Sequence, residues 1–366
     1  MKYIFILGNN PELSQAEIKA VLPQLKVLAQ AKEFLVAETD KFSCADLLER
    51  LGGTIKIGVV LGAKPDFGPI LGAASSAAGK FKFGVSFYGV KKSNFGMQAK
   101  GLLKEKSVSA RLVESREPYL SSVIVTKEKC HDFIVLPDYF GLTCAVQNFK
   151  DYGHRDFGRP AADAFSGMLP PKVAKIMINL SGAKTDDVIL DPFCGSGTIL
   201  SEALALGFRN LVGTDFSDKA IQDTESNLKW LTEQLNIKYS ILNIKIFKQD
   251  IRKLPEDIPD SSINAIVTEP FLGQPLRGNE KPETIEKIIS ELSELYVESF
   301  WKFKKILKPE GKIVIVVPQW HIHGKVYNLN IENKVQAIGL RRLDNDDLIY
   351  KRENQKVWRK IEIWSK

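Results

Sequence analysis

The chain has 366 residues, of which 44% are hydrophobic and 26% are charged, with 51 Lys and Arg against 44 Asp and Glu. This length indicates two or three domains, and the composition excludes wholesale disorder and collagen-like structure. No apolar run reaches the ~18 residues that a membrane helix needs, and the short apolar stretch after Met1 predicts no secretory signal. The net charge of +7 is unevenly spread, because residues 1–150 hold 20 basic and 14 acidic residues.

Residues 1–63 alternate between short apolar runs of strand type and amphipathic stretches of helical type. The expected strands are 3–7, 26–30, 34–39 and 54–62, and the expected helices are 11–22 and 42–51. The order βαββαβ predicts a ferredoxin-like N-terminal module.

Residues 64–79 are rich in Gly, Ala, Ser and Pro and predict a connection. A second α+β module is then expected, so that 64–150 forms one RNA-binding unit. Its strands are predicted at 82–89, 109–115, 121–128, 132–138 and 142–149, with a basic helix at 95–106.

The basic excess of the first part is concentrated in residues 80–116, which hold nine basic and two acidic residues interleaved with aromatics. Lysine contacts to phosphates supply affinity without reading sequence, so this segment predicts an RNA-binding surface. A solvated helix face is the alternative. The candidate RNA-binding lysines are Lys91, Lys92, Lys100, Lys104 and Lys106.

The four cysteines, Cys44, Cys130, Cys144 and Cys194, are scattered, and no pair has CxxC spacing. This pattern argues against a disulfide framework and against a zinc site, and it fits a reducing cytosol. The histidines also lack metal-ligand spacing, so we expect no metal.

Residues 151–182 predict a linker that ends in a helix after Pro170, and its polar start includes Arg155, a further RNA-binding candidate. From 183 to 366 strand and helix patterns alternate, which predicts a parallel α/β sheet covered by helices. The expected strands are 188–193, 211–216, 244–250, 264–270 and 312–318, with two more that end near residue 364.

The sharpest motif is DPFCGSGT, residues 191–198, which follows a strand and opens a helix. Its two glycines allow a ligand to approach the backbone closely, and the helix start offers free amides. Asp191 at the strand end suits the cationic part of a ligand better than a pyrophosphate. The candidate ligand-binding residues of this motif are Asp191, Phe193, Gly195, Gly197 and Thr198.

Two further acids, Asp215 and Asp250, stand at the ends of the next two strands. Asp215 is placed to accept hydrogen bonds from the hydroxyls of a ribose, and Asp250 is placed to meet an adenine amino group. Each alone is more often a helix N-cap, but three acids at consecutive strand ends converge on the crevice where α/β sheets bind ligands. Phe216 and Ile251, the residues next to Asp215 and Asp250 in the sequence, are further candidates for ligand binding.

These motifs resemble the class I S-adenosylmethionine-dependent methyltransferases, whose amino-methyltransferases carry D-P-F-x-G-x-G-T. Together with the two N-terminal modules and the segment HRDFGRPAADAFSGMLPPKVA, the chain resembles the THUMP-containing tRNA guanine-N2-methyltransferases of the guanosine-10 type. The resemblance implies a Rossmann-like sheet with an antiparallel last strand, S-adenosylmethionine as cofactor and tRNA as partner, and it leaves room for a small activator subunit.

The fourth strand ends in TEPFLG, residues 268–273, where the family has [D/N/S]-P-P-[Y/F]. Aligning the acid makes Glu269 the acceptor of the amine, whereas aligning the aromatic places Thr268 there and Phe271 as the ring that stacks on a flipped base. Both registers keep Pro270. The next loop, 273–283, is either a lid that carries Arg277 to the RNA or an ordinary solvated loop.

The predicted activity is methyl transfer to an exocyclic base amine, most specifically N2 of a tRNA guanine. A DNA amino-methyltransferase would share both motifs. A non-catalytic RNA-binding protein would fit the altered 268–272 segment, and a nicotinamide enzyme is disfavoured by Asp191.

Overall fold

The computed structural model describes the whole chain except residues 162–167, 239–240, 254–257, 277, 344–346 and 353–354. The described residues divide into two compact units, Met1–Asp151 and Tyr152–Lys366. In the part of the chain that is described, no helix is both long and apolar enough to cross a membrane.

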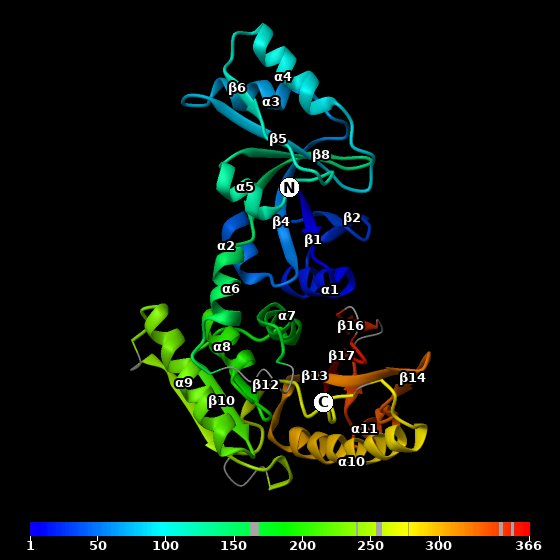
Figure 1. The fold of residues 1–366 in the computed structure, drawn as a ribbon. Coiled ribbons are helices and arrows are strands. Elements are labelled where there is room, and N and C mark those ends of the chain that lie inside the picture. The colour runs from blue at the N-terminus through cyan, green and yellow to red at the C-terminus, as the bar shows by residue number, and fades with distance from the viewer. Residues whose placement is uncertain (162–167, 239–240, 254–257, 277, 344–346, 353–354) are drawn as a thin grey trace. The chain divides into compact units, whose positions relative to one another are not determined.

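The first unit is built on one eight-stranded sheet with the order β2-β3-β1-β4-β8-β7-β5-β6 (Figure 1). The elements that supply its first half are β1 (Lys2–Leu7), α1 (Pro11–Val21), β2 (Lys26–Gln30), β3 (Phe34–Glu38), α2 (Cys44–Arg50) and β4 (Thr54–Gly62). These four strands are antiparallel to their neighbours, which is the arrangement of a ferredoxin-like module.

The second half of this sheet is added to β4 by antiparallel pairing with β8. Its elements are α3 (Phe67–Ser75), β5 (Phe81–Phe87), α4 (Phe95–Glu105), β6 (Ala110–Leu112), α5 (Ser122–Glu128), β7 (His131–Val135) and β8 (Phe140–Val146). Helix α6 (Phe149–Phe157) follows. The α+β character expected of both N-terminal modules is confirmed.

Three local predictions for this unit are wrong. Residues 121–128 form helix α5 instead of a strand, because Ser121 caps it by accepting from the amide of Ile124 at 3.3 Å. The connection expected at 64–79 contains α3, whose first turn is capped by Asp66. Cys44 and Cys144 form a disulfide across 100 residues of sequence, a pairing that spacing cannot reveal.

The second unit is built on a nine-stranded sheet whose main path is β11-β10-β9-β12-β13-β17-β15. The elements of its parallel part are α7 (Pro171–Ser181), β9 (Val188–Asp191), α8 (Thr198–Ala205), β10 (Asn210–Asp215), α9 (Asp218–Gln234), β11 (Asn243–Lys248), the 3-10 turn η2 (Ile251–Lys253), β12 (Ile263–Thr268), α10 (Pro282–Ile306) and β13 (Leu307–Ile322). The last elements are β14 (Lys325–Asn328), α11 (Glu332–Ala337), β15 (Arg341–Arg342), β16 (Leu348–Tyr350) and β17 (Val357–Ser365).

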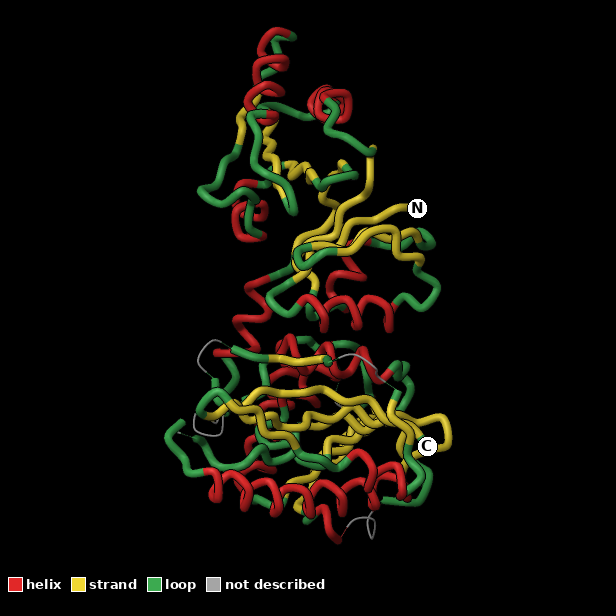
Figure 2. Tube along the Cα trace, turned by 90° about the vertical axis from the view of Figure 1, so that its right-hand side faces the viewer, coloured by secondary structure: helices red, strands yellow, loops and turns green. Residues whose placement is uncertain are grey.

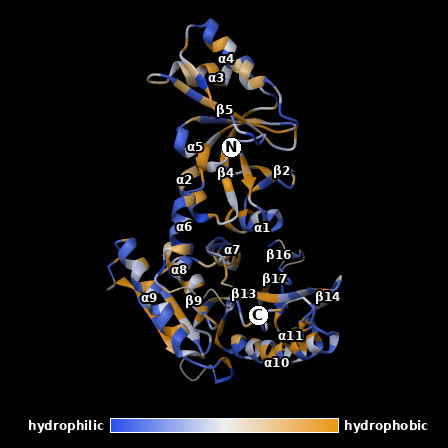
Figure 3. Ribbon diagram, viewed as in Figure 1, coloured by the Kyte–Doolittle hydropathy of each residue, from blue (hydrophilic) through white to orange (hydrophobic). Residues whose placement is uncertain are grey.

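This sheet is parallel from β11 to β13, and β17 runs antiparallel to β13, so the predicted Rossmann-like sheet with an antiparallel last strand is confirmed. Figure 2 shows its strands between helical layers. The strands are largely hydrophobic in Figure 3, whereas α10 alternates hydrophobic and hydrophilic residues. Phe300 and Phe303 of α10 pack with Ile313 and Trp364 of the sheet in one buried core.

Two features of this unit exceed the sequence expectation. β13 is 16 residues long instead of seven, and it continues beyond the sheet core to pair with β14. The C-terminal segment also forms more strands than the two that were expected, because β15 and β16 add short antiparallel pairings to β17. What matters for function is that β9 has β10 on one side and β12 on the other, so the chain changes direction along the sheet there.

Candidate active site

The glycine loop between β9 and α8 is packed on one side and open on the other. Gly195 and Gly197 have φ values of +53° and +78°, which favour glycine. A Cβ added to Gly197 would lie 3.0 Å from Thr224 of α9, whereas a Cβ added to Gly195 would meet nothing within 4 Å. The open side therefore leaves room for a ligand against the backbone.

Asp215 ties the end of β10 to this loop. Its Oδ2 accepts a hydrogen bond from the amide of Gly195 at 3.1 Å, and its Oδ1 accepts one from the amide of Ser217 at 3.0 Å. The ring of the next residue, Phe216, is 73% exposed. An anchored carboxylate beside an exposed ring can bind the hydroxyls and one face of a nucleoside.

Asp250 follows β11 and lies beside the 3-10 turn η2. Its carboxylate accepts from Nε of Arg252 at 3.0 Å and from Nη2 at 2.5 Å, and this interaction lowers the pKa of Asp250. Ile251 is buried. An amino group that approached Asp250 would have to share the carboxylate with Arg252.

Asp191, at the end of β9, is almost fully buried. Its Oδ1 accepts hydrogen bonds from the hydroxyl of Thr268 at 2.7 Å and from the amide of Phe193 at 3.2 Å. Burial raises the pKa of Asp191 to about 7, and the negative charges of Asp215 and Glu269 act in the same direction. The Thr268 hydrogen bond joins β9 to β12, the two neighbouring strands between which the order of strand addition reverses.

The last residue of β12 and the segment that follows it hold the predicted acceptor residues. Thr268 is fully buried, so its hydroxyl is enclosed together with Asp191. Glu269 accepts from Nε and Nη2 of Arg359 at 2.8 and 3.0 Å, and its side chain keeps 16% exposure. Pro270 is buried, and the ring of Phe271 is 56% exposed.

This arrangement keeps one candidate residue from each of the two possible alignments of residues 268–273 with the family motif. Glu269 offers the more accessible side-chain oxygen, whereas Phe271 offers the exposed ring. Burial raises the pKa of Glu269, while the hydrogen bonds and charge of Arg359 oppose that rise.

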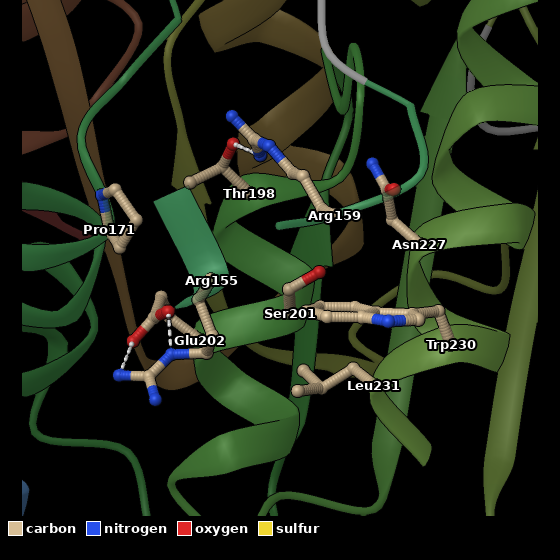
Figure 4. Close-up of a pocket in the computed structure, with 9 residues that line it drawn as sticks. All are labelled: Arg155, Arg159, Pro171, Thr198, Ser201, Glu202, Asn227, Trp230 and Leu231. Atoms are coloured by element: carbon tan, nitrogen blue, oxygen red, sulfur yellow. Dashed lines mark hydrogen bonds and ion pairs between the residues drawn. The ribbon is translucent and has the colours of Figure 1, made fainter. Parts of the chain in front are cut away.

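The segment Arg159–Ala161 lies against the start of α8. Nη1 of Arg159 donates to the hydroxyl of Thr198 at 2.7 Å, which Figure 4 shows beside a small pocket. Asn227 of α9 binds both the amide and the carbonyl of Ala161 and also donates to the carbonyl of Ser196. These bonds hold the segment close to the glycine loop.

Arg155 also lines this pocket, and its guanidinium is turned toward Glu202 of α8, with Nε donating to Oε1 at 2.6 Å (Figure 4). Its charge is therefore balanced within the second unit. Lys91, Lys92, Lys100, Lys104 and Lys106 are all exposed in the first unit, on or beside α4. Arg277 lies outside the described residues.

The sequence did not reveal Arg359, Thr224 or Asn227. Arg359 is a buried arginine in β17, a strand with an otherwise apolar inner face. A basic residue in such a strand signals a buried counter-charge, but it does not identify the partner. Thr224 and Asn227 read as ordinary polar residues of a helix.

Comparison with known proteins adds to this geometry. Residues 159–346, about half of the chain, match a family described as "RMKL-like, methyltransferase domain". The chain is 25% identical to a tRNA (guanine(10)-N2)-dimethyltransferase of Pyrococcus abyssi, over 87% of this chain and 88% of that protein. It is 34% identical to a "Probable tRNA (guanine(10)-N2)-dimethyltransferase" of Methanothermococcus thermolithotrophicus, over 39% of this chain and 77% of that protein. Its fold is similar to the crystal structure of TrmN from Thermus thermophilus, with a TM-score of 0.54 and 15% identity over the full length of both chains.

Proposed function

Because the chain belongs to the RMKL-like methyltransferase domain family, and is thus an S-adenosylmethionine-dependent methyltransferase, we propose that it methylates N2 of a guanine in tRNA. The relatives from Pyrococcus abyssi and Methanothermococcus thermolithotrophicus carry names that specify guanine 10. We assign the same nucleotide to this chain. A tRNA substrate supports a cytoplasmic location.

One observation carries the proposal: hydrogen bonds join the ends of three parallel strands into a single site. The amide of Gly195 bonds to Asp215, and Thr268 bonds to Asp191. The candidate residues for cofactor and for acceptor therefore meet at one edge of the sheet, where α/β proteins bind their ligands.

The residues at this edge fit S-adenosylmethionine. The open side of Gly195 admits a ligand to the backbone, and a site containing Asp191 and Asp215 attracts the cationic amino-acid end. Asp215 would hold the ribose hydroxyls, and Phe216 with Ile251 and Asp250 would border the adenine. When bound, the cofactor supplies a methyl group on a sulfonium, and the bond to sulfur breaks as the bond to nitrogen forms.

The chain's own contribution to the transfer is to position the amine. An exocyclic amine is a weak nucleophile, because its lone pair is delocalised into the ring. Glu269 would accept an N–H bond of this amine, and Phe271 would stack on the base after it leaves its helix. Thr268 and Pro270, on either side of Glu269, would fix the backbone at this point.

The lysines around α4, in the first unit, would hold the RNA through its backbone. Phosphate contacts from Lys91, Lys92, Lys100, Lys104 and Lys106 supply affinity that depends on salt and not on base sequence. A folded tRNA would then be recognised by its shape, as THUMP-like modules are expected to do, and the catalytic pocket would select the base.

The test is transfer of labelled methyl groups from the cofactor to unmodified tRNA, with duplex DNA as the competing substrate. We expect incorporation into tRNA only. Glu269→Ala should lower turnover by about 10²-fold, the effect of removing one transition-state hydrogen bond, while cofactor binding is retained. Incorporation into DNA would favour a DNA amino-methyltransferase, and no incorporation would favour a non-catalytic RNA-binding protein.

A further inference from the structure

The ion pair between Glu269 and Arg359 joins two segments that lie 90 residues apart. Glu269 follows β12, and Arg359 lies near the start of β17, opposite Pro318 of β13. The two hydrogen bonds, at 2.8 and 3.0 Å, engage both carboxylate oxygens in a fork. The Arg359 side chain is 6% exposed, so water has little access to the ion pair.

Burial of the Arg359 charge is unfavourable for folding, so the ion pair needs a reason beyond stability. A buried charge loses several kcal/mol of hydration, and its neutral replacement by an apolar side chain is often tolerated or stabilising. Its next two neighbours on the same face of β17, Ile361 and Ile363, are apolar, and Ile361 is fully buried. An apolar residue would therefore fit this strand.

The groups that face Glu269 come from three other elements. Asp191 of β9 adds a negative charge, and the buried Tyr296 of α10 lies near enough to be affected by the charge of Glu269. The hydroxyl of Tyr296 donates to the carbonyl of Val316 at 3.1 Å. Arg359 is thus the basic group that these contacts place against the carboxylate, in surroundings that otherwise disfavour its charge.

We propose that Arg359 is a positioning residue of methyl transfer, an inference that rests on the proposed function. Arg359 keeps the Glu269 carboxylate ionised and fixed in place as the acceptor for the substrate amine. An ionised carboxylate has oxygen lone pairs left after it accepts two bonds from arginine. One of these accepts the N–H of the amine. When nitrogen gains the methyl group it loses a proton, which passes to Glu269 and from there to water.

Loss of Arg359 has a signature that a purely structural role does not give. Without the guanidinium, burial favours the protonated form of Glu269, which is a poorer acceptor. Turnover of Arg359→Met should therefore fall about 10²-fold at neutral pH and recover in part as the pH rises. Binding of cofactor and tRNA should stay within about threefold of wild type.

The experiment measures single-turnover transfer to tRNA between pH 6 and 9 for wild type, Arg359→Met, Arg359→Lys and Glu269→Gln. Arg342→Met is the matched control, because Arg342 is a mostly buried arginine whose ion pairs with Glu332 and Glu362 lie toward the other end of β17. Thermal unfolding of each variant identifies those that fail to fold. Arg359→Lys, which keeps the charge, covers the case in which Arg359→Met unfolds.

The expected result is an alkaline shift of the pH profile in Arg359→Met that is absent from Arg342→Met and smaller in Arg359→Lys. The double variant Arg359→Met with Glu269→Gln should lose no more activity than the worse single variant, because both act on one carboxylate. Folded variants with unchanged turnover and pH profile would overturn the inference. If the wild type itself transfers no methyl group to tRNA, the proposed function fails. If the wild type is active and the Arg359 variants are equally active, only the inference about Arg359 fails.

Discussion

Two buried ion pairs among the described residues, one in each unit, have different surroundings. In the first unit, Nζ of Lys56 lies 2.5 Å from Oδ2 of Asp132, and both side chains are at most 1% exposed. Ser86 and Thr143 also donate to Asp132 at 2.6 and 3.1 Å. The network spans four neighbouring strands and is closed on every side.

The pair in the second unit lies at an edge instead. Arg359 and Glu269 meet where β12 ends, the glutamate side chain keeps 16% exposure, and the exposed ring of Phe271 follows. A carboxylate whose bonds are all made within the fold contributes to stability and specificity, whereas one at the carboxyl ends of parallel strands can also serve a ligand. The difference between the two pairs is therefore one of location and access.

The largest effect is expected from breaking the closed network. Lys56→Met leaves Asp132 buried without its cation, which should lower the free energy of unfolding by about 3–5 kcal/mol. Lys82→Met is the control, because Lys82 pairs with Glu128 at 3.5 Å with a side chain that is 37% exposed, and exposed pairs contribute at most about 1 kcal/mol. Urea denaturation followed by circular dichroism measures both. Equal losses in the two variants would show that the buried pair contributes no more to stability than an exposed one.

A smaller effect is expected at the ligand edge. Asp215→Ala removes a carboxylate that would bind the ribose, and hydrogen bonds to charged groups contribute about 1.5–3 kcal/mol. The dissociation constant for the cofactor, measured by titration calorimetry, should rise about 10- to 100-fold. Asp218→Ala, at an exposed acid of the same region, should leave it unchanged. An unaltered affinity in Asp215→Ala would remove this residue from the site.

The pH dependence of cofactor affinity tests Asp191. Its pKa is raised from 3.8 to about 7, so the free protein at pH 6 holds it mostly protonated. A cationic ligand prefers the carboxylate, so affinity should increase about tenfold from pH 6 to pH 8 and then level off. In the cofactor-free protein the sign is reversed, and the contribution of Asp191 to stability should fall as the pH rises from about 4 to about 7. Asp191→Asn should flatten both curves, and a wild-type affinity that is level over this range would exclude the role.

The smallest effect per residue is expected from the exposed lysines. Lys100→Ala with Lys104→Ala should weaken tRNA binding and reduce the slope of log affinity against log salt by about 1–2, one phosphate contact for each lysine. Lys19→Ala with Lys26→Ala removes the same charge from exposed positions outside the cluster. Filter binding at several salt concentrations measures both pairs. Equal slopes in the two double variants would show that only net charge matters.

The sequence predicted what depends on local pattern. Unbroken apolar runs and the glycine motif indicated the parallel sheet and placed Asp191 and Asp215 at neighbouring strand ends. Local pattern failed at residues 121–128, where β-branched residues suggested a strand but a serine cap and tertiary packing produce α5.

Long-range pairing was beyond a single sequence. Lys56 is the one basic residue of β4, and Arg359 lies on a face of β17 with two isoleucines; a basic residue in either place signals a buried partner but does not identify it. Their partners lie 76 and 90 residues away. The disulfide between Cys44 and Cys144 was missed for the same reason. Since it removes the cysteine pattern as an argument for a reducing compartment, the proposed cytoplasmic location depends on the RNA substrate alone.

Identification of the methylated nucleoside is the most direct test of guanine-N2 methylation by this protein. Unmodified tRNA is incubated with the protein and S-adenosylmethionine, digested to nucleosides and fragments, and examined by mass spectrometry. We expect N2-methylated guanosine at position 10, carrying one or two methyl groups, and no product from a transcript in which that guanosine is replaced. A methyl group on an adenine or cytosine amine, or tRNA left unmethylated by an enzyme that binds cofactor, would contradict this expectation.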